Sequence, residues 1–457
     1  MTETPSLRRV LGPVDAIAVV IGAIVGVGIF FTPSRVAALV GSGSWVLATW
    51  AIGGLIAVLG ALTYADLGRL YPRTGGQYEL LRDAFGPALG FVYVTCNATA
   101  IQAGSVAIIA LVCSHNLALA VTGAPAGTLA GGLIAGGLIV ALMGINAVGG
   151  RQGAAVQNAT VVAKLLTLLA VVGAASWFGG APAPPDAPVV AAPAPASASA
   201  IATAVGAGLV PVLFSFGGWQ QALWIGGEKR RPRRDVPLSI LVGVGVVVAI
   251  YLATNWAYLQ LLGHARVAAS DTVAADAVAV VWGEGGRRAL AGAVALSAFG
   301  VLNAQLLTGP RLVYAMALDG RFFRSFAQLH ARTSTPVPAI AMLGGTALVL
   351  LALAGARGID RLLTGVVLID GLFFALTGAA LLVLRRRAPS GPEGPARPYP
   401  GYPVTAALFV LAECGVVWGA FADPAVRAAA HVGLAWIAAA LLAYLALFRR
   451  GRPGEDE

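Results

Sequence analysis

Charged residues are scarce in this 457-residue chain, where Asp, Glu, Lys and Arg together make up 11% of the sequence. A soluble domain carries about 25%. Hydrophobic residues make up 58%, which is more than a soluble fold can hide from water, and the mean hydropathy is +0.82. These values exclude a soluble globular protein, a fibre and a disordered chain, and they indicate a polytopic membrane protein.

The residue patterns of enzymes and metal sites are also missing. The three cysteines lie inside apolar runs and predict no disulfide framework. The four histidines are scattered without metal-ligand spacing, and neither a Ser/His/Asp set nor a G-x-x-x-x-G-K-[ST] loop is present. We therefore expect no enzyme activity, no metal, no cofactor and no ATP-driven transport by this chain alone. The first apolar run lacks a small-residue cleavage site, so we expect it to be retained.

Long apolar runs dominate what is there. A membrane helix needs about 20 apolar residues. Runs of this length predict an all-α protein with about 12 transmembrane helices, at Asp15–Val40, Ser44–Leu70, Phe85–Cys113, Gly127–Val148, Ala155–Phe178, Ile201–Gly226, Val236–Leu262, Arg288–Leu318, Val337–Ala356, Arg361–Leu384, Tyr402–Phe421 and Ala429–Phe448. The connection Gly179–Ala200 is rich in Pro and Ala and predicts an external loop without chemistry. Gly263–Gly286 predicts a second external loop, with room for short helices.

The positions of the positive charges indicate how the chain is oriented in the membrane. The net charge is +10, which could suggest nucleic acid, but the Lys and Arg residues lie in short clusters between the apolar runs. Most of them fall on the side that holds both ends of the chain. Cytoplasmic loops carry such an excess. We therefore expect both termini in the cytoplasm, a multi-pass protein of the cell inner (plasma) membrane and no nucleic acid partner.

Two runs contain helix-breaking residues near the middle of the membrane. The first run has Gly22, Gly26 and Gly28, and the sixth has Pro211 ahead of the pair Gly217-Gly218. Interrupted helices at matching positions of two halves are typical of inverted-repeat transporters. The freed N–H groups favour an anion and the freed C=O groups a cation, and an amino acid offers both. Close helix packing by small residues is the alternative interpretation.

Four segments carry a family resemblance. They are Gly26–Phe30 (GVGIF), Tyr64–Tyr78 (YADLG…GGQY), Phe214–Pro237 (FSFGGW…RDVP) and Gly300–Pro338 (GVLN…TPVP). In order and spacing they resemble amino acid permeases of the APC superfamily, and within it the L-type amino acid transporter branch. The resemblance implies a LeuT-like fold, a 5+5 inverted repeat with broken helices 1 and 6.

The same resemblance implies a domain plan. Residues 1–12 would form a cytoplasmic tail, and 13–384 the ten-helix transport core, with repeats at 13–179 and 200–384. Residues 402–448 would add two C-terminal helices, and 449–457 a second cytoplasmic tail. In animal members a heavy chain attaches through a cysteine after span 3. Leu117–Ala126 has no cysteine here, so we expect no disulfide-linked heavy chain.

Substrate contacts follow from the resemblance, position by position. The carboxylate would meet backbone N–H groups at Gly26, Val27 and Gly28. The amine would meet backbone carbonyls of Ile24, Phe214 and Gly217. Phe214 would be the aromatic gate over the pocket, and Trp219 would close it from the span 6 side. Val27 departs from the family, which often has Ser there, so a hydroxyl contact to the carboxylate is missing.

Lys164 lies about ten residues into the fifth run. A charged residue near mid-bilayer costs about 2.5–3.5 kcal/mol on insertion scales and is a functional-site hypothesis by default. Family members with a lysine here use its ammonium where sodium-coupled relatives hold Na⁺, bridging span 1 to span 5. Snorkelling of the side chain to the cytoplasmic interface is the alternative.

Other polar residues inside the runs are weaker candidates. Asp370 in span 10 could carry a coupled proton or pair with another group, and a protonated or locally hydrogen-bonded acid is the alternative. Asp66 and Glu228 lie beside arginine clusters and predict ion pairs of an inner gate. Asn97, Gln102, Asn303 and Gln305 could face a cavity or join helices by hydrogen bonds.

The sequence therefore predicts a secondary active transporter in the lipid bilayer. Its substrate would be an amino acid, neutral because no acid lies near the two breaks. It would work by alternating access without sodium, either by exchange or by proton-coupled uptake. A cationic amino acid or polyamine antiporter is the first alternative, and a non-transporting nutrient sensor is the second.

Overall fold

The computed structural model describes residues 11–72, 75–178, 197–270, 272–387, 397–422 and 424–448. Within these ranges every regular element is a helix, and Leu11 and Lys229 form one isolated parallel bridge. The side chains of residues 150–152, 154, 354–368, 420–422 and 424–430 are not described. Most of the predicted Pro/Ala-rich loop and nearly all of both predicted tails lie outside the described residues.

The helices confirm the prediction of an all-α polytopic membrane protein. Among the described residues, eight segments meet the length and hydropathy expected of a membrane-crossing helix, and three more apolar helices are shorter. The α-helices are α1 (Pro13–Ile24), α2 (Thr32–Val40), α3 (Gly43–Leu70), α4 (Gln77–Phe85), α5 (Pro87–Cys96), α6 (Gln102–Thr122), α7 (Thr128–Val148), α8 (Gly150–Phe178), α9 (Ala198–Phe216), α10 (Gln221–Trp224), α11 (Pro232–Ala269), α12 (Val273–Thr308), α13 (Pro310–Leu318), α14 (Val337–Arg387), α15 (Val404–Ala422) and α16 (Pro424–Ala443).

The helix assignments bear on two predicted boundaries. Predicted spans 9 and 10 both lie in α14, which is helical without interruption over Val337–Arg387. One crossing of the bilayer needs about 20 residues, so the 51 residues of α14 are enough for both spans. The predicted connection at Gly263–Gly286 holds short helical segments, as the sequence allowed, and non-helical angles at Gly263 (φ 73°) and Gly283 (φ 58°) separate them from the long parts of α11 and α12.

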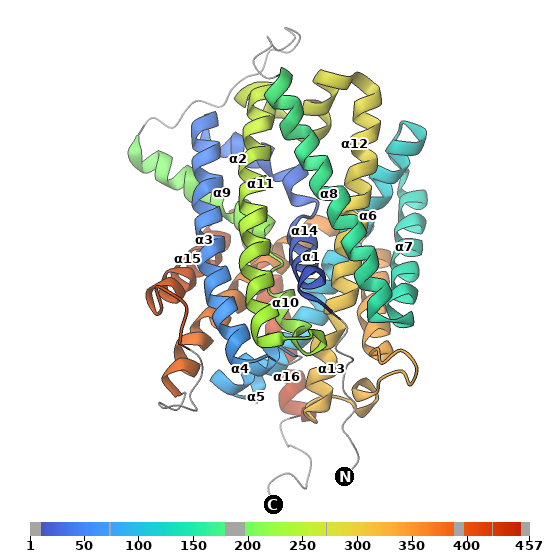
Figure 1. The fold of residues 1–457 in the computed structure, drawn as a ribbon, viewed down its shortest axis with the longest axis vertical. Coiled ribbons are helices and arrows are strands. Elements are labelled where there is room, and N and C mark those ends of the chain that lie inside the picture. Colours follow the sequence, from blue (N-terminus) through green and yellow to red (C-terminus); the bar gives the residue numbers. More distant parts are fainter. Residues whose placement is uncertain are drawn as a thin grey trace, which may run out of the picture.

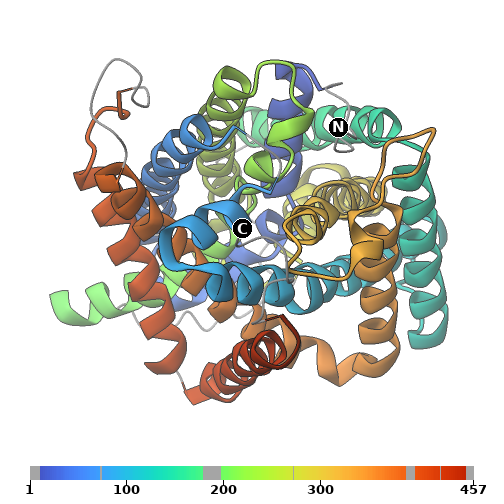
Figure 2. The ribbon, with the colours of Figure 1, turned by 90° about the horizontal axis from the view of Figure 1, so that it is seen from below.

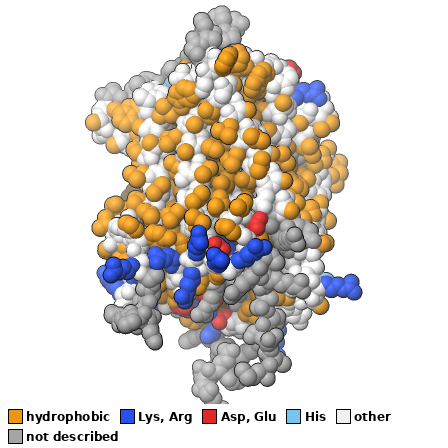
Figure 3. Space-filling view, viewed as in Figure 1, with side chains coloured by type: hydrophobic (Ala, Val, Ile, Leu, Met, Phe, Trp, Pro, Cys, Tyr) orange, Lys and Arg blue, Asp and Glu red, His pale blue; other side chains and the backbone are white. Residues whose placement is uncertain are grey.

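The helices stand side by side in a bundle that surrounds α1 (Figure 1). The helices α15 and α16 lie at the edge of the bundle (Figure 2). Hydrophobic side chains cover the middle of the visible face, and Lys and Arg form a band near the end that holds α4, α5 and α13 (Figure 3). An apolar belt bordered by a basic band is the surface expected of a protein that crosses a bilayer.

Candidate functional site

The helix of the first predicted span breaks where its glycines lie. The helix α1 ends at Ile24, and Val25 (φ −71°, ψ 82°) forms a tight three-residue turn in which Gly26 N–H donates to the Ile24 carbonyl at 2.7 Å. These angles are those of an inverse γ-turn. A short 3₁₀ turn (η1, Gly28–Phe30) follows, and α2 begins at Thr32. Val25 N–H still donates to the Ile21 carbonyl at 2.7 Å, but the N–H groups of Gly26, Val27 and Gly28 make no helical hydrogen bond.

The helix of the sixth predicted span breaks beside it. The helix α9 ends at Phe216, Gly217 is extended (ψ 150°), and Gly218 has φ +133°, which L side chains rarely adopt. A Cβ atom on Gly218 would lie 2.8 Å from the carbonyl carbon of Ala23 and 2.9 Å from the Ile24 nitrogen. Glycine is required here for both reasons. The two breaks are thus in backbone contact.

Lys164 on α8 is 1% exposed and reaches the end of α1. Its Nζ donates to the Gly22 carbonyl at 2.9 Å and to the Val25 carbonyl at 2.8 Å. An ammonium at the C-terminal end of a helix is stabilised by the helix dipole as well as by the hydrogen bonds. The side chain therefore does not snorkel to the membrane surface, and it joins span 5 to the broken part of span 1.

Two hydroxyl groups complete this cap on α1. Tyr251 on α11 donates from its OH to the Ile24 carbonyl at 2.9 Å, and Ser297 on α12 donates to the Val25 carbonyl at 3.5 Å. Sequence reasoning missed both residues, although each is a hydroxyl inside a long apolar run. With Gly26 N–H and Tyr251 OH as donors, both lone pairs of the Ile24 carbonyl are used in this conformation.

The first amides after the break are free to bind an anion. Among the described residues, no hydrogen bond has the N–H of Val27 or Gly28 as its donor. Gly26 and Val27 are half-buried. A Cβ on Gly28 would lie 2.8 Å from Ser215 Oγ, and that hydroxyl donates to Thr32 Oγ1 at 2.9 Å. Gly28 is therefore closely packed against α9 as well as adjacent to the free amides.

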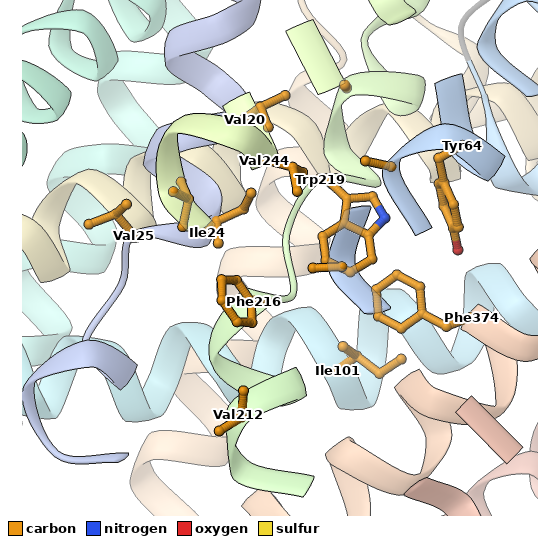
Figure 4. Close-up of a cluster of buried hydrophobic side chains, with 14 of the residues drawn as sticks. Val20, Ile24, Val25, Tyr64, Ile101, Val212, Phe216, Trp219, Val244 and Phe374 are labelled. Carbon is orange, nitrogen blue, oxygen red and sulfur yellow. The ribbon is translucent and has the colours of Figure 1, made fainter. Parts of the chain in front are cut away.

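The two aromatic residues expected at the site differ in exposure. Phe214 is 39% exposed, and its carbonyl accepts a hydrogen bond from Gly217 N–H at 3.2 Å. Trp219 is 1% exposed and packs edge-on against Tyr64, with ring centroids 6.2 Å apart. Figure 4 shows the Trp219 ring beside Tyr64 and Phe374, with Ile24 and Val25 on its other side. Trp219 is thus fully packed inside the bundle, whereas Phe214 is partly exposed.

A second polar cluster lies between the site and the basic end of the bundle. Asn303 on α12 donates to the Gly153 carbonyl at 2.8 Å and accepts from Asn146 Nδ2 at 3.0 Å. Gln157 approaches Gly22 so closely that a Cβ there would lie 1.7 Å from its Nε2. Asn303 therefore joins helices, as the interhelical alternative predicts, and Gly22 admits Gln157 where no larger residue would fit.

Buried ion pairs close the basic end. Arg311 Nε lies 2.7 Å from Glu228 Oε1, and the two side chains are 0% and 5% exposed. Asp66 pairs with Arg385, whose Nε lies 3.2 Å from Asp66 Oδ2. Both acids predicted as gate residues therefore have arginine partners. Leu11 adds two backbone hydrogen bonds, to Glu228 (3.0 Å) and from Arg230 (3.1 Å).

Lys229 lies in this closed end, outside the membrane-spanning segments, and was not singled out from the sequence. Its side chain is 0% exposed and donates to Ser239 Oγ at 3.0 Å. Burial lowers the pKa of Lys229 to about 7, against a smaller opposing effect of Asp235. The lysine is therefore near its titration point in the folded protein at neutral pH.

Asp370 stands apart from these contacts. It is half-buried on α14, and none of the hydrogen bonds of the described residues involves its carboxylate. The carboxylate of Glu413 on α15 lies nearby, since Glu413 Oε2 would be 3.7 Å from a Cβ on Gly371. Asp370 is thus separate from the contacts around the two breaks.

Apolar helices, two touching breaks and a lysine-capped half-helix define a multi-span membrane protein with two interrupted helices at its centre. The chain belongs to the amino acid permease family, and the sequence pattern of that family matches residues 11–446. It is 28% identical over 417 residues to the serine/threonine exchanger SteT of Bacillus subtilis, covering 90% of this chain and 92% of that protein.

Two human proteins are similar to the same extent. The b(0,+)-type amino acid transporter 1 is 29% identical over 393 residues, covering 84% of this chain and 77% of the human protein. The large neutral amino acids transporter small subunit 2 is 28% identical over 407 residues, covering 85% and 72%. These matches confirm the resemblance noted from the sequence motifs, and they identify the chain as an integral membrane protein of an amino acid transport family.

Proposed function

We propose that this protein moves neutral amino acids across the plasma membrane by sodium-independent alternating access, through exchange or through proton coupling. The observation that carries the proposal is the position of Lys164, whose ammonium donates to the Gly22 and Val25 carbonyls. These are the carbonyls that a bound cation would otherwise stabilise at the end of a half-helix. A covalently attached cation removes the need for sodium.

The substrate carboxylate binds the amides of Val27 and Gly28, which have no other acceptor among the described residues. A charge-assisted hydrogen bond to a backbone N–H is about twice as strong as a neutral one. The substrate amine binds the carbonyls of Phe214 and Gly217. It reaches the Ile24 carbonyl only if the Tyr251 hydroxyl turns away, since that carbonyl has two donors already.

Phe214 is the gate on the accessible side, and the ion pairs Glu228–Arg311 and Asp66–Arg385 hold the other side shut. Alternation then requires two changes. Phe214 must cover the substrate, and the ion pairs must separate so that α1 and α10 move away from α13. Closure of a gate over bound substrate commits the substrate to transport.

Topology follows the same proposal. The transport core is a 5+5 inverted repeat of about 12 spans in total, with two additional C-terminal helices and both termini in the cytoplasm. The position of the basic band supports this orientation (Figure 3). The chain works without a disulfide-linked heavy chain, and the predicted attachment loop belongs mostly to α6, which extends to Thr122. Asp370 serves as the coupling acid if transport is driven by protons.

Reconstitution tests the proposal directly. Purified protein in sodium-free liposomes should accumulate a labelled neutral amino acid when the lumen contains unlabelled substrate, or when an inward proton gradient is imposed. The first result identifies exchange and the second proton coupling. Empty liposomes are the control. Uptake under neither condition, or uptake only with sodium, contradicts the proposed function.

A further inference from the structure

Four arginines stand together on the connection between α10 and α11, and the side chains of all four are exposed. They are Arg230, Arg231, Arg233 and Arg234. The first two precede α11, which begins at Pro232, and the other two lie in its first turn. Like charges repel one another over such short distances, so negative charge beside the cluster would stabilise it.

The acidic side chains next to the cluster already have partners. Glu228 pairs with Arg311, 2.7 Å away, and the Asp235 carboxylate accepts a hydrogen bond from the Arg231 backbone N–H at 3.0 Å. Within the described part of the chain, none of the four guanidinium groups forms an ion pair or a hydrogen bond. The chain itself therefore supplies little counter-charge to this cluster.

The N-terminal end of α11 adds to the positive charge. Unpaired backbone N–H groups give this end of a helix a partial positive charge, which favours an anion and disfavours a cation. Arg231 is the N-cap residue and makes no side-chain cap, and the acid of the first turn is Asp235. The four arginines therefore stand where the helix favours the opposite charge, and a bound anion would relieve both sources of repulsion.

The cluster lies at the edge of the membrane-spanning part of α11. It ends two residues before Val236, where the apolar run of predicted span 7 begins. Glu228, two residues ahead of the cluster, pairs with Arg311 of α13, which lies at the basic end of the bundle (Figure 1, Figure 3). Basic clusters of this size directly beside a transmembrane helix are typical of sites for anionic lipids. A guanidinium group binds a phosphate through two parallel hydrogen bonds.

We propose that Arg230, Arg231, Arg233 and Arg234 bind the phosphate groups of anionic phospholipids in the membrane leaflet at the basic end of the bundle. A lipid fits this position better than a free phosphate, because its acyl chains hold the phosphate at the edge of the apolar belt. The inference goes beyond the proposed transport and does not depend on which substrate is carried.

Lipid bound here acts on the inner ends of both interrupted helices. Arg230 N–H donates to the Leu11 carbonyl at 3.1 Å, and Leu11 N–H donates to the Glu228 carbonyl at 3.0 Å. Leu11 lies two residues before α1, and Glu228 lies four residues after α10. A ligand stabilises the state that it binds. Anionic lipid therefore stabilises the closed arrangement of the basic end, in which these contacts form.

The test is lipid binding by the purified full-length protein in mixed micelles of detergent and phosphatidylcholine. Wild-type protein should bind a fluorescent phosphatidylglycerol about tenfold or more tightly than a fluorescent phosphatidylcholine, since each arginine near an anionic lipid surface contributes severalfold. Added phosphatidylglycerol should also raise its melting temperature. The preference should fall between about 0.1 M and 1 M salt, because screening shortens the range of the attraction.

The test variant carries four substitutions, Arg230→Gln, Arg231→Gln, Arg233→Gln and Arg234→Gln. It should bind the two lipids with affinities within about twofold of each other. The matched control removes the same charge from the same end of the bundle outside the cluster, with Arg321→Gln, Arg324→Gln, Arg332→Gln and Arg386→Gln. The control should keep the wild-type preference.

Equal affinity of the wild type for the two lipids overturns the inference. An equal loss of preference in the control does the same, because the lipid then responds to the charge of the whole surface. Inorganic phosphate that raises the melting temperature as much as phosphatidylglycerol does would show a free-anion site and contradict the lipid assignment. If the fourfold variant does not fold, Arg230→Gln with Arg231→Gln replaces it and should lower the preference by about threefold or more. An unchanged preference in that variant overturns the inference.

These outcomes are distinct from failure of the proposed function. Lipid binding is measured without amino acid, so its absence leaves amino acid transport intact. Absence of amino acid uptake likewise leaves the lipid site intact.

Discussion

At the scale of single residues, glycine positions in this protein are decided by what a Cβ would meet. Gly28 faces Ser215 on α9, where a Cβ would lie 2.8 Å from Oγ and 3.4 Å from Cα. Gly206, which lies on α9 as Ser215 does, has nothing within 4 Å of its Cβ position. The two glycines therefore respond differently to the same substitution.

Gly28→Leu should abolish substrate binding while the protein remains inserted. The new side chain must displace Ser215 and covers the approach to the free amides. Gly206→Leu is the matched control and should bind as the wild type does. Equilibrium binding of labelled amino acid to detergent-purified protein measures the difference. If correctly inserted Gly28→Leu protein binds amino acid as the wild type does, the substrate carboxylate does not bind at these amides.

Lys229 gives a prediction for pH. Its pKa is about 7 in the folded protein and about 10.4 in an unfolded chain, so the unfolded state binds more protons between these values. Wild-type stability should therefore rise with pH from about 7 to about 10. Lys229→Met should be more stable than the wild type below pH 7, and the difference should shrink as pH rises. Thermal unfolding in detergent across this range measures it.

Arg230→Met is the control for this pH series, because Arg230 is the exposed neighbour of the buried lysine. Its melting temperature should follow the wild-type pH dependence. A parallel pH dependence in Lys229→Met and wild type would show that Lys229 does not titrate in this range.

The residue scale also shows how far the sequence could predict the site. Lys164 could be singled out because a charge in a 20-residue apolar run is costly and rare. Its two acceptors on α1 could not be assigned from residues alone, since they are backbone carbonyls freed by the break. Tyr251 and Ser297 were missed because hydroxyl groups occur widely in membrane helices, where most donate to their own backbone.

At the scale of elements, the two interrupted helices depend on each other. The backbone of α1 at Ala23 and Ile24 occupies the space beside Gly218, whose φ of +133° already requires glycine. Sequence reasoning placed both breaks correctly, because Gly26 and Gly217–Gly218 cannot stabilise a helix interior. It could not predict that the breaks touch, since contact between distant segments depends on the packing of the whole bundle.

Gly218→Ala should destabilise the protein by about 1–3 kcal/mol from backbone strain, with a further loss from the contact with α1. Gly245→Ala on α11 is the opposite case, because its Cβ would meet nothing within 4 Å. Alanine stabilises a helix interior by up to about 1 kcal/mol relative to glycine. Thermal unfolding of both variants should therefore shift in opposite directions, and equal shifts would contradict the close approach.

Element boundaries show a limit of hydropathy. The helix α14 is continuous over both predicted spans 9 and 10, and the short helices of the predicted outer connection lie between non-helical angles at Gly263 and Gly283. Glycine and charge mark where a helix could end. Whether it does end depends on what packs against it, and a single sequence carries no direct record of that.

At the scale of the whole molecule, the basic end of the bundle is held together by buried ion pairs and by the backbone bridge to Leu11. A transporter that works by alternating access must open this end of the bundle and close the opposite end. The ion pairs at the basic end therefore contribute to the balance between the two states.

Arg311→Met should cost about 3–5 kcal/mol, because it leaves Glu228 buried without its partner. Adding Glu228→Gln removes the buried charge and should recover part of this loss. Arg287→Met breaks an exposed pair with Glu284, 3.6 Å apart, and should change stability by less than about 1 kcal/mol. Thermal unfolding of the three variants tests the ranking. An Arg311→Met loss as small as that of Arg287→Met would mean that the inner pair does not hold the end closed.

In the proposed mechanism, Lys164 supplies the cation on which the broken helix depends. Its most direct test is amino acid uptake into sodium-free, pH-clamped liposomes by wild type beside Lys164→Ala and Lys164→Arg. Wild-type uptake should be the same with and without sodium. Lys164→Ala should be impaired, and Lys164→Arg should not restore uptake because guanidinium is larger and does not deprotonate. An absolute sodium requirement in the wild type, or full uptake by Lys164→Ala, would contradict this role of Lys164.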